Sequence, residues 1–491
     1  MLRAMGQGIS RRAAVWASLA LASLTGTAAA APEPGDSAWY VIVARDGATI
    51  GHRSHENVPG PDGRRIVDVQ QIDLVEQHHG PLHLSRRSEV REDAAGRTIA
   101  ISEETRDGET WVRSEARIAT DAAEIVRTSP SDRRTVRVAL PAGVRFDDGD
   151  DLLPGWNPLG APLDFRNFDI GAMAVERVVI ERLDPAPDSE GRIAVARRRY
   201  DGEALRGVAR LVLDRDRRIV SISQAMLGGS ITLRATDRDT ALRKRPAPNV
   251  PLELSITSPF RISDAARRGH IRYRFSFIDG LAFGLPETGE QRAAPANGTA
   301  TIDICETCGP GLPDTPDALA DARKPTPWLQ SDSAMIRAIA APVARLPLSD
   351  AGKMKLLAKR AREHLKRVEV SGHYSALDAL KRGAGDCTED AVVLAALGRA
   401  AGIPTRVANG LVYARQRFHG TSNAFLPHSW TLAWADGAWR SFDLSLGDFD
   451  ATHIALTVGD GDARSVMAAN QLASLLRWDA MTEVRPRPAS R

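Results

Sequence analysis

The stretch Arg382-Gly-Ala-Gly-Asp-Cys-Thr-Glu-Asp390 decides how the last third of this 491-residue chain is interpreted. Glycines break the chain before Cys387, Asp386 is a preferred N-cap residue, and residues 391–401 favour a helix that Gly402 ends. The stretch therefore predicts a helix that begins at Cys387. Unpaired N–H groups and the positive end of the helix dipole lower the pKa of a thiol. We expect Cys387 to be an activated nucleophile.

A hairpin is predicted downstream of this helix. Asp436-Gly437 is a strong two-residue turn signal, and it lies between two runs rich in Trp, Leu and Phe. If Ala435 pairs with Ala438, then Trp434 lies opposite Trp439. Aromatic pairing supports this register.

In this register His428 and Asp443 share one face of the hairpin. Trp430 lies opposite Asp443, so His428 is the diagonal neighbour of Asp443, with α-carbons about 7–8 Å apart. A three-residue turn would place His428 and Asp443 on opposite faces. We expect His428 to take the proton of Cys387 and to protonate the leaving amine, while Asp443 orients the imidazole. The backbone N–H of Cys387 is a candidate oxyanion donor, and the sequence identifies no second donor.

Several short motifs around these residues resemble the transglutaminase-like core of bacterial proteins. The motifs are 380–387 (LKRGAGDC), 400–406 (AAGIPTR), 410–413 (GLVY), 428–430 (HSW) and 450–454 (DATHI). The resemblance covers roughly residues 325–460. It implies a papain-related α+β fold, with the Cys helix packed on an antiparallel sheet, and acyl transfer through a thioester. Because that superfamily includes cross-linkers, peptidases, amidases and inactive copies, it indicates the chemistry better than the substrate.

Three nearby residues have structural interpretations. Glu389 and Asp390 are expected to favour the helix N-terminus rather than to act in chemistry. His453 follows a turn-like segment, and we interpret it as structural, with a place in the cleft as the alternative.

The first 31 residues are typical of a signal peptide. Arg3, Arg11 and Arg12 precede the apolar run 13–24, and small residues at 27–31 offer cleavage sites. The apolar run is too short to span a bilayer, and no other segment approaches the roughly 20 residues required. We expect export through the Sec route to the periplasm, with a twin-arginine signal as the alternative.

Charge and cysteine content fit an exported protein that does not bind nucleic acid. The chain has 65 basic and 62 acidic residues, and its net charge of +3 disappears when residues 1–31 are removed. Cys305 and Cys308 are expected to form a disulfide, which leaves Cys387 as the free thiol. A redox role for the CxxC pair is less favoured, because the pair follows a strand-like run and precedes Gly-Pro. We expect no metal and no cofactor, since no ligand set has suitable spacing.

The predicted fold is multidomain, with an N-terminal antiparallel all-β region followed by an α+β transglutaminase-like (papain-related) domain. Short alternating runs separated by turn signals indicate the β region, and residues 333–344 and 350–368 are expected to form helices beside the Cys helix. The predicted segments are 1–31 (signal peptide), 32–250 (antiparallel β-sheet domain), 251–308 (small β segment ending in CxxC), 309–330 (linker) and 331–491 (catalytic domain).

The function expected from these features is amide-bond chemistry by an exported cysteine enzyme. We favour hydrolysis, as by a peptidase or amidase, because amine transfer requires a site that excludes water and the sequence shows none. The alternatives are a protein-glutamine transglutaminase and a catalytically inactive binding or scaffold protein. The expected partner is a protein or peptide, cell-envelope peptides included, and the β region is expected to position the substrate or to act as a scaffold. The oligomeric state stays open.

Overall fold

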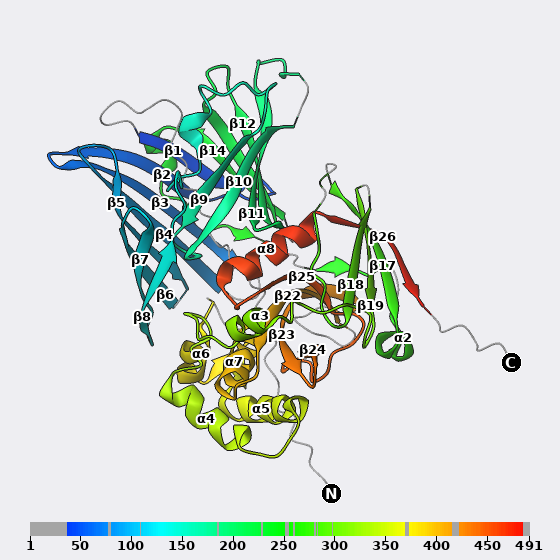
Figure 1. The fold of residues 1–491 in the computed structure, drawn as a ribbon. Helices are drawn as coiled ribbons and strands as arrows, with labels where there is room; N and C mark the ends of the chain where they lie inside the picture. The colour runs from blue at the N-terminus through cyan, green and yellow to red at the C-terminus, as the bar shows by residue number, and fades with distance from the viewer. Residues whose placement is uncertain are drawn as a thin grey trace, which may run out of the picture.

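The computed structural model of the chain describes residues 37–484 apart from 77–79, 109, 184–185, 227–228, 251–254, 259–260, 279–280, 282, 297, 369–372 and 415–421. The predicted signal peptide, residues 1–31, lies outside these described residues. Figure 1 shows a large curved sheet in blue to green beside a part that contains helices and smaller sheets. No helix in the described part of the chain is long and apolar enough to cross a membrane.

The N-terminal part is a single large antiparallel sheet, as predicted. Its fourteen main strands are β1 (Ser37–Val43), β2 (Thr49–Gly60), β3 (Gly63–Glu76), β4 (Gly80–Asp93), β5 (Thr98–Asp107), β6 (Thr110–Ile118), β7 (Ala122–Thr128), β8 (Arg133–Ala139), β9 (Leu163–Asp169), β10 (Ala174–Arg182), β11 (Ile193–Asp201), β12 (Ala204–Leu213), β13 (Ile219–Met226) and β14 (Gly229–Thr236). A fifteenth strand, β15 (Asn249–Val250), pairs in parallel with β3. The strand order β8 to β1 followed by β14 to β9 means that two meanders meet where β1 pairs with β14.

Local sequence explains this meander. Buried and exposed side chains alternate along β6, which is the pattern of a strand with one face covered. Gly47 and Gly96 occupy turns between neighbouring strands and have positive φ angles of 88° and 76°. Glycine adopts this conformation without steric cost, so neighbouring strands reverse within a few residues.

The sheet curves until its two ends approach each other. Val90, Ile101 and Ile125 from β4, β5 and β7 form a buried cluster with Phe168 of β9 and with Ile170. The concave face is therefore enclosed between strands from both halves of the meander, as the curvature in Figure 1 shows.

The C-terminal part is α+β, as predicted. Its helices are α3 (Pro316–Asp321), α4 (Ala334–Ala344), α5 (Asp350–His364), α6 (Ala376–Arg382), α7 (Cys387–Ala400) and α8 (Ala463–Ser474). Its strands, together with those of residues 256–304, are β16 (Ile256–Thr257), β17 (Ile271–Phe277), β18 (Gln291–Ala296), β19 (Thr299–Ile304), β20 (Lys366–Arg367), β21 (Ala384–Gly385), β22 (Thr405–Ala414), β23 (Ala424–Ala435), β24 (Ala438–Phe442), β25 (Ile454–Gly459) and β26 (Leu476–Glu483). Three short elements complete the described chain: η1 (Asp150–Leu152), α1 (Arg238–Ala241) and α2 (Asp264–Arg268).

Helix α7 is the centre of this part. It packs on β22 and β23, and α4, α5 and α6 surround it. The five-stranded sheet runs β16-β23-β22-β25, with β24 paired to β23. A second sheet, β18-β19-β17-β26, joins the chain's last strand to residues 271–304. The most buried helix and the central strand thus carry the predicted nucleophile and base.

Two helices predicted beside α7 are present, with one correction. Helix α4 begins after its N-cap Ser333, as expected. Helix α5 ends at His364 instead of continuing to residue 368, because the backbone becomes extended at Leu365 and β20 pairs with β21. Residues 309–330, predicted to be a linker, contain α3, and the domain boundaries stay a prediction.

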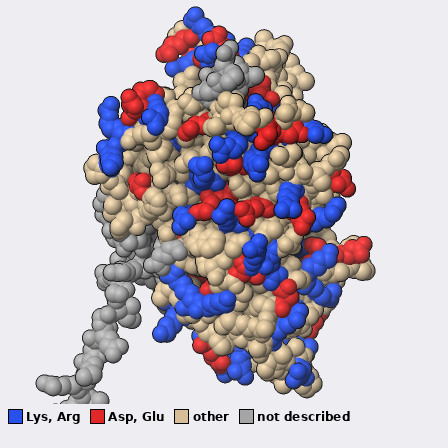
Figure 2. Space-filling model, turned by 90° about the vertical axis from the view of Figure 1, so that its left-hand side faces the viewer, with Lys and Arg blue, Asp and Glu red and all other residues tan. Residues whose placement is uncertain are grey.

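The two parts of the molecule contact each other directly. Arg134, which belongs to β8, donates two hydrogen bonds of 3.0 and 2.6 Å to the carboxylate of Asp332. The hydroxyl of Ser129 donates to Asp378 Oδ2 at 3.1 Å. Helix α8 packs on β12 and β13 of the large sheet. On the face shown in Figure 2, basic and acidic side chains are interspersed rather than gathered into a field of one sign.

Candidate active site

Cys387 is the first residue of α7, as the sequence predicts. The Asp386 side chain accepts a hydrogen bond of 2.8 Å from the N–H of Thr388, and the Glu389 carboxylate accepts one of 3.1 Å from the N–H of Asp386. The Asp386 side chain also accepts a hydrogen bond from the backbone N–H of Glu389, and the two reciprocal bonds between Asp386 and Glu389 form a capping box, which fixes the start of the helix. The predicted structural role of Glu389 is therefore confirmed.

The hairpin has the predicted register. Ala435 pairs with Ala438, and Trp434 pairs with Trp439. Asp436 and Gly437 have positive φ angles of 55° and 81°, as a two-residue turn of this twist requires. The even turn keeps the two predicted site residues of the hairpin on one face.

His428 and Asp443 contact each other inside the protein. His428 Nε2 lies 2.8 Å from Asp443 Oδ2, and the side chains are 0% and 1% exposed. Since Nε2 is engaged by Asp443, the other ring nitrogen, Nδ1, is the atom that would receive a proton from a thiol.

Cys387 lies against the same strand. The backbone N–H of Ser429, the residue after His428, donates a hydrogen bond to the Cys387 sulfur. One turn further along α7, the carbonyl of Ala391 accepts a 2.9 Å bond from the hydroxyl of Thr431 on β23. These contacts at Ser429 and Thr431, which both follow His428 on β23, hold the start of α7 beside the strand that carries the imidazole.

The surroundings of Cys387 overturn one expectation. Burial raises the pKa of this thiol well above its ordinary value, and the carboxyl groups of Asp386 and Glu389 raise it further. The N–H of Ser429 opposes this increase without reversing it. The prediction that the helix N-terminus lowers the pKa of Cys387 is wrong for the free protein. A thiol with a raised pKa needs a base to remove its proton.

His453 belongs to the same polar network. Its Nε2 lies 3.0 Å from Asp443 Oδ2, the oxygen that His428 also contacts. Its Nδ1 lies 3.3 Å from Asp450 Oδ1. Burial alone would lower the pKa of His453, but the hydrogen bonds to Asp443 and Asp450 raise it to about 9. Sequence reasoning missed this contact, although it singled out the DATHI motif, because strand periodicity does not extend into the preceding turn.

The two carboxylates of this network are held ionised. Burial would raise the pKa of Asp443, but His428 and His453 keep it well below its usual range. His453 and Arg267 have the same effect on Asp450, and Arg267 Nε lies 2.6 Å from Asp450 Oδ2. Asp443 therefore offers a full negative charge to both imidazoles.

Two clusters in the described part of the chain have the composition of metal sites. In the first, ligand atoms of His428, Asp443 and His453 lie within 4.8 Å of one another. Those side chains already form the hydrogen bonds given above, so we interpret the cluster as two histidines hydrogen-bonded to one carboxylate. The second cluster contains Cys305 and Cys308, whose sulfurs form the predicted disulfide.

Comparison with known proteins gives one family and several distant structures. Residues 337–444, which include Cys387, His428 and Asp443, match the model of the transglutaminase-like superfamily. No curated protein matches.

Solved structures are similar only at low identity. A protein from Cytophaga hutchinsonii with the provisional description of cysteine protease is 14% identical, with a TM-score of 0.28, over 44% of this chain and 86% of its own. A beta-barrel-like protein of a domain of unknown function from Brucella abortus is 11% identical, with a TM-score of 0.33, over 42% of this chain and 98% of its own. A protein from Parabacteroides distasonis with the provisional description of protease is 10% identical, with a TM-score of 0.20, over 79% of this chain and 70% of its own. The family match confirms the resemblance inferred from the motifs: the chain contains a domain of the transglutaminase-like superfamily at residues 337–444.

Proposed function

We propose that this protein is an exported cysteine enzyme that hydrolyses amide bonds through Cys387, His428 and Asp443. The observation that supports this most strongly is the buried 2.8 Å contact between His428 Nε2 and Asp443 Oδ2. Ser429, the residue after His428, donates its backbone N–H to the Cys387 sulfur. Periplasmic export is part of the proposal, since disulfides such as Cys305–Cys308 persist in oxidising compartments.

The first half of the reaction forms a thioester. His428 removes the thiol proton as the Cys387 sulfur attacks the amide carbonyl carbon, and a carbon–sulfur bond forms. The backbone N–H of Cys387, at the first position of α7, has no acceptor within the helix and can stabilise the oxyanion. The imidazolium then gives its proton to the nitrogen as the carbon–nitrogen bond breaks. The amine leaves, and the acyl group stays on sulfur.

The second half consumes water. His428 removes a proton from a water molecule that attacks the thioester carbonyl, and the carbon–sulfur bond breaks. The acid is released, and the thiol regains its proton. Because burial raises the pKa of Cys387, the general base matters in both halves, and Asp443 stabilises the imidazolium in each.

His453 acts in this proposal as a positioning residue. It contacts Asp443 Oδ2, the oxygen that His428 also contacts, and so helps to hold the carboxylate in place. Its second contact, to Asp450, anchors the network to Arg267. We expect these contacts to prevent rotation of the Asp443 carboxylate, so that its hydrogen bond to His428 is kept when His428 becomes charged.

The substrate in this proposal is a protein or peptide, including peptides of the cell envelope. The large sheet, residues 37–236, has the role of scaffold or substrate-positioning element, because it contacts the catalytic part through Arg134–Asp332 and Ser129–Asp378. A boundary between these parts at residues 309–330 belongs to the same proposal.

The test uses the mature chain with a defined peptide mixture, analysed by mass spectrometry with and without an excess of a primary alkylamine. Hydrolysis predicts new peptide termini that contain one added water and that the amine does not suppress. The Cys387→Ala variant is the control and should give none of these products. Amine incorporated at glutamine would indicate a transglutaminase instead, and identical products from wild type and Cys387→Ala would reject a cysteine enzyme.

A further inference from the structure

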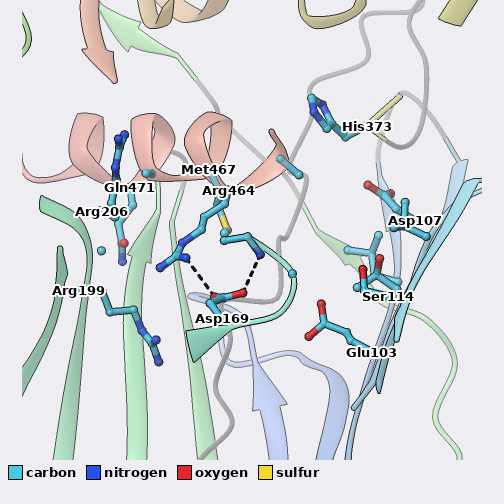
Figure 3. A pocket seen from close by; sticks show the side chains of 18 of the residues that line it. Glu103, Asp107, Ser114, Asp169, Arg199, Arg206, His373, Arg464, Met467 and Gln471 are labelled. Carbon is cyan, nitrogen blue, oxygen red and sulfur yellow. Dashed lines mark hydrogen bonds and ion pairs between the residues drawn. The ribbon is translucent and has the colours of Figure 1, made fainter. Parts of the chain in front are cut away.

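A cavity lies between the large sheet and the catalytic part, away from the candidate active site. Figure 3 shows it bounded by α8 on one side and by strands that carry Glu103, Asp107 and Ser114 on the other. Its volume is about 170 Å³. Its apolar lining includes Leu84, Val112, Val208, Ala209, Trp328 and Met467. Cys387, His428, Asp443 and His453 do not line it.

Two polar side chains of this lining come from one face of the sheet. Asp107 lies opposite Thr110 in the pairing of β5 with β6, and Arg127 lies opposite Ser114 in the pairing of β6 with β7. Thr110 and Ser114 are four residues apart on β6, so alternation places them on the same side. Asp107 and Arg127 therefore both face the cavity, on strands separated by one strand.

Arg127 is a buried cation with an unused donor. The residue is 3% exposed, and its Nη1 donates to the carbonyl of Pro327 at 3.2 Å. Its guanidinium lies over the Trp328 ring, 4.4 Å from the centroid. Its Nη2 has no hydrogen-bond partner among the described residues. Burial lowers its pKa to about 10, although the carboxyl groups of Asp378 and Asp132 act in the opposite direction.

Asp107 is the complementary group. Its Oδ1 is buried and has no hydrogen-bond partner in the described part of the chain. The carboxyl group accepts a hydrogen bond from the backbone N–H of His373, yet burial raises its pKa to about 7. A cation placed against Oδ1 would favour the ionised carboxylate. One end of the cavity therefore has a buried donor without a partner, and the other has a buried acceptor without a partner, among the residues that the structure describes.

The distance between these two groups defines the length of a ligand. Four residues along a strand and two strand spacings separate their α-carbons by roughly 13 Å and 10 Å in the two directions. Asp107 and Arg127 are accordingly too far apart to pair with each other. A ligand that satisfies both must be extended, and an extended peptide covers about 3.3–3.6 Å per residue.

We propose that this cavity binds a short extended peptide of about two to four residues with free termini. Its carboxylate contacts Arg127, and its ammonium group contacts Asp107. Apolar side chains in between pack on Val112, Trp328 and Met467. A free carboxylic acid offers no cation to Asp107 and a free amine offers no anion to Arg127, whereas a peptide with free termini offers both. The proposal does not rest on the catalytic proposal, because peptide binding is measured without turnover.

The experiment measures binding of Ala-Leu-Ala to the full mature chain that carries Cys387→Ala, which removes hydrolysis. Trp111 and Trp328 line the cavity, so tryptophan fluorescence reports occupancy, and isothermal titration gives Kd. The N-acetylated and C-amidated forms of the same peptide each lack one terminal charge. Each should bind at least about tenfold more weakly than the free peptide, because each loses a charge-assisted hydrogen bond.

Two variants test which terminus of the peptide contacts Asp107 and which contacts Arg127. With Asp107→Asn, the free and acetylated peptides should bind equally, while amidation still weakens binding. With Arg127→Gln, the free and amidated peptides should bind equally. Arg113→Gln is the matched control, since Arg113 lies on the neighbouring strand β6, is half-exposed and pairs with Glu115. It should leave every Kd unchanged.

A further variant protects the test against misfolding, because Arg127 also contacts the catalytic part. Val112→Phe narrows the cavity from β6 and keeps both charged groups in the sequence, and it should abolish binding while circular dichroism stays that of the parent. The absence of saturable binding of Ala-Leu-Ala would overturn the proposal. Equal Kd values for the free, acetylated and amidated peptides would overturn it as well.

Discussion

Replacement of His453 by glutamine tests the network behind the candidate triad. In the folded protein the carboxylates of Asp443 and Asp450 raise the pKa of His453 from 6.5 to about 9. The side chain is 1% exposed, so solvent screens these interactions little. Such a shift corresponds to about 3 kcal/mol of folding stability.

The sign of the pH dependence follows from the direction of this shift. The pKa of His453 is higher in the folded state than in the unfolded state, so protonation favours folding. The contribution is fully present below pH 6.5 and is lost as the pH rises through about 9. Since glutamine carries no titrating charge, the stability difference between wild type and His453→Gln should shrink by about 3 kcal/mol across this window.

Urea unfolding at intervals between pH 6 and pH 9.5, followed by circular dichroism and tryptophan fluorescence, measures this difference. The carboxyl groups of Asp107, Asp150 and Asp390, whose pKa burial raises to about 7, titrate in both proteins and cancel in the comparison. A difference between wild type and variant that stays constant over this pH range would refute the charged His453 and its contact with Asp443.

Three further predictions concern single features of the fold and site. Asp443→Asn should slow acylation by about 10²–10⁴-fold while preserving the circular dichroism spectrum, and wild-type rates in this variant would remove Asp443 from the mechanism. Gly410→Ala should destabilise the protein by about 1–3 kcal/mol in urea unfolding, because its Cβ would lie 1.9 Å from the Ile454 carbonyl oxygen; an unchanged midpoint would contradict that close approach. Cys305→Ser with Cys308→Ser should cost about 2 kcal/mol of stability and leave acylation intact, whereas loss of acylation would show that the disulfide supports the site.

Local sequence rules predicted the parts of the fold that depend on contacts between residues close together in the sequence. Alternation and Asp-Gly turns indicate consecutive antiparallel strands, and the two-residue turn at Asp436-Gly437 fixes the register of Trp434 opposite Trp439. From that register the proximity of His428 and Asp443 follows, and the structure has them 2.8 Å apart. The pairing of β1 with β14 joins residues about two hundred positions apart, and no local pattern predicts it.

Burial accounts for what the sequence could not predict at the site. A helix N-terminus is visible in the sequence around Asp386, but the loss of solvent that raises the pKa of Cys387 depends on packing. His453 reaches Asp443 from a turn, where side-chain direction has no fixed period. The cavity is harder still to predict, because Arg127 and Trp328 come from different parts of the molecule.

The central claim, that His428 activates Cys387 for acyl transfer, is tested most directly by trapping the acyl-enzyme. The mature protein is mixed with p-nitrophenyl acetate, quenched at short times, and analysed by intact mass and peptide mapping. The triad predicts one acetyl group on Cys387, formed at least about a hundredfold more slowly in His428→Ala and absent in Cys387→Ala. Equal rates of Cys387 acetylation in wild type and in a folded His428→Ala variant would contradict the claim.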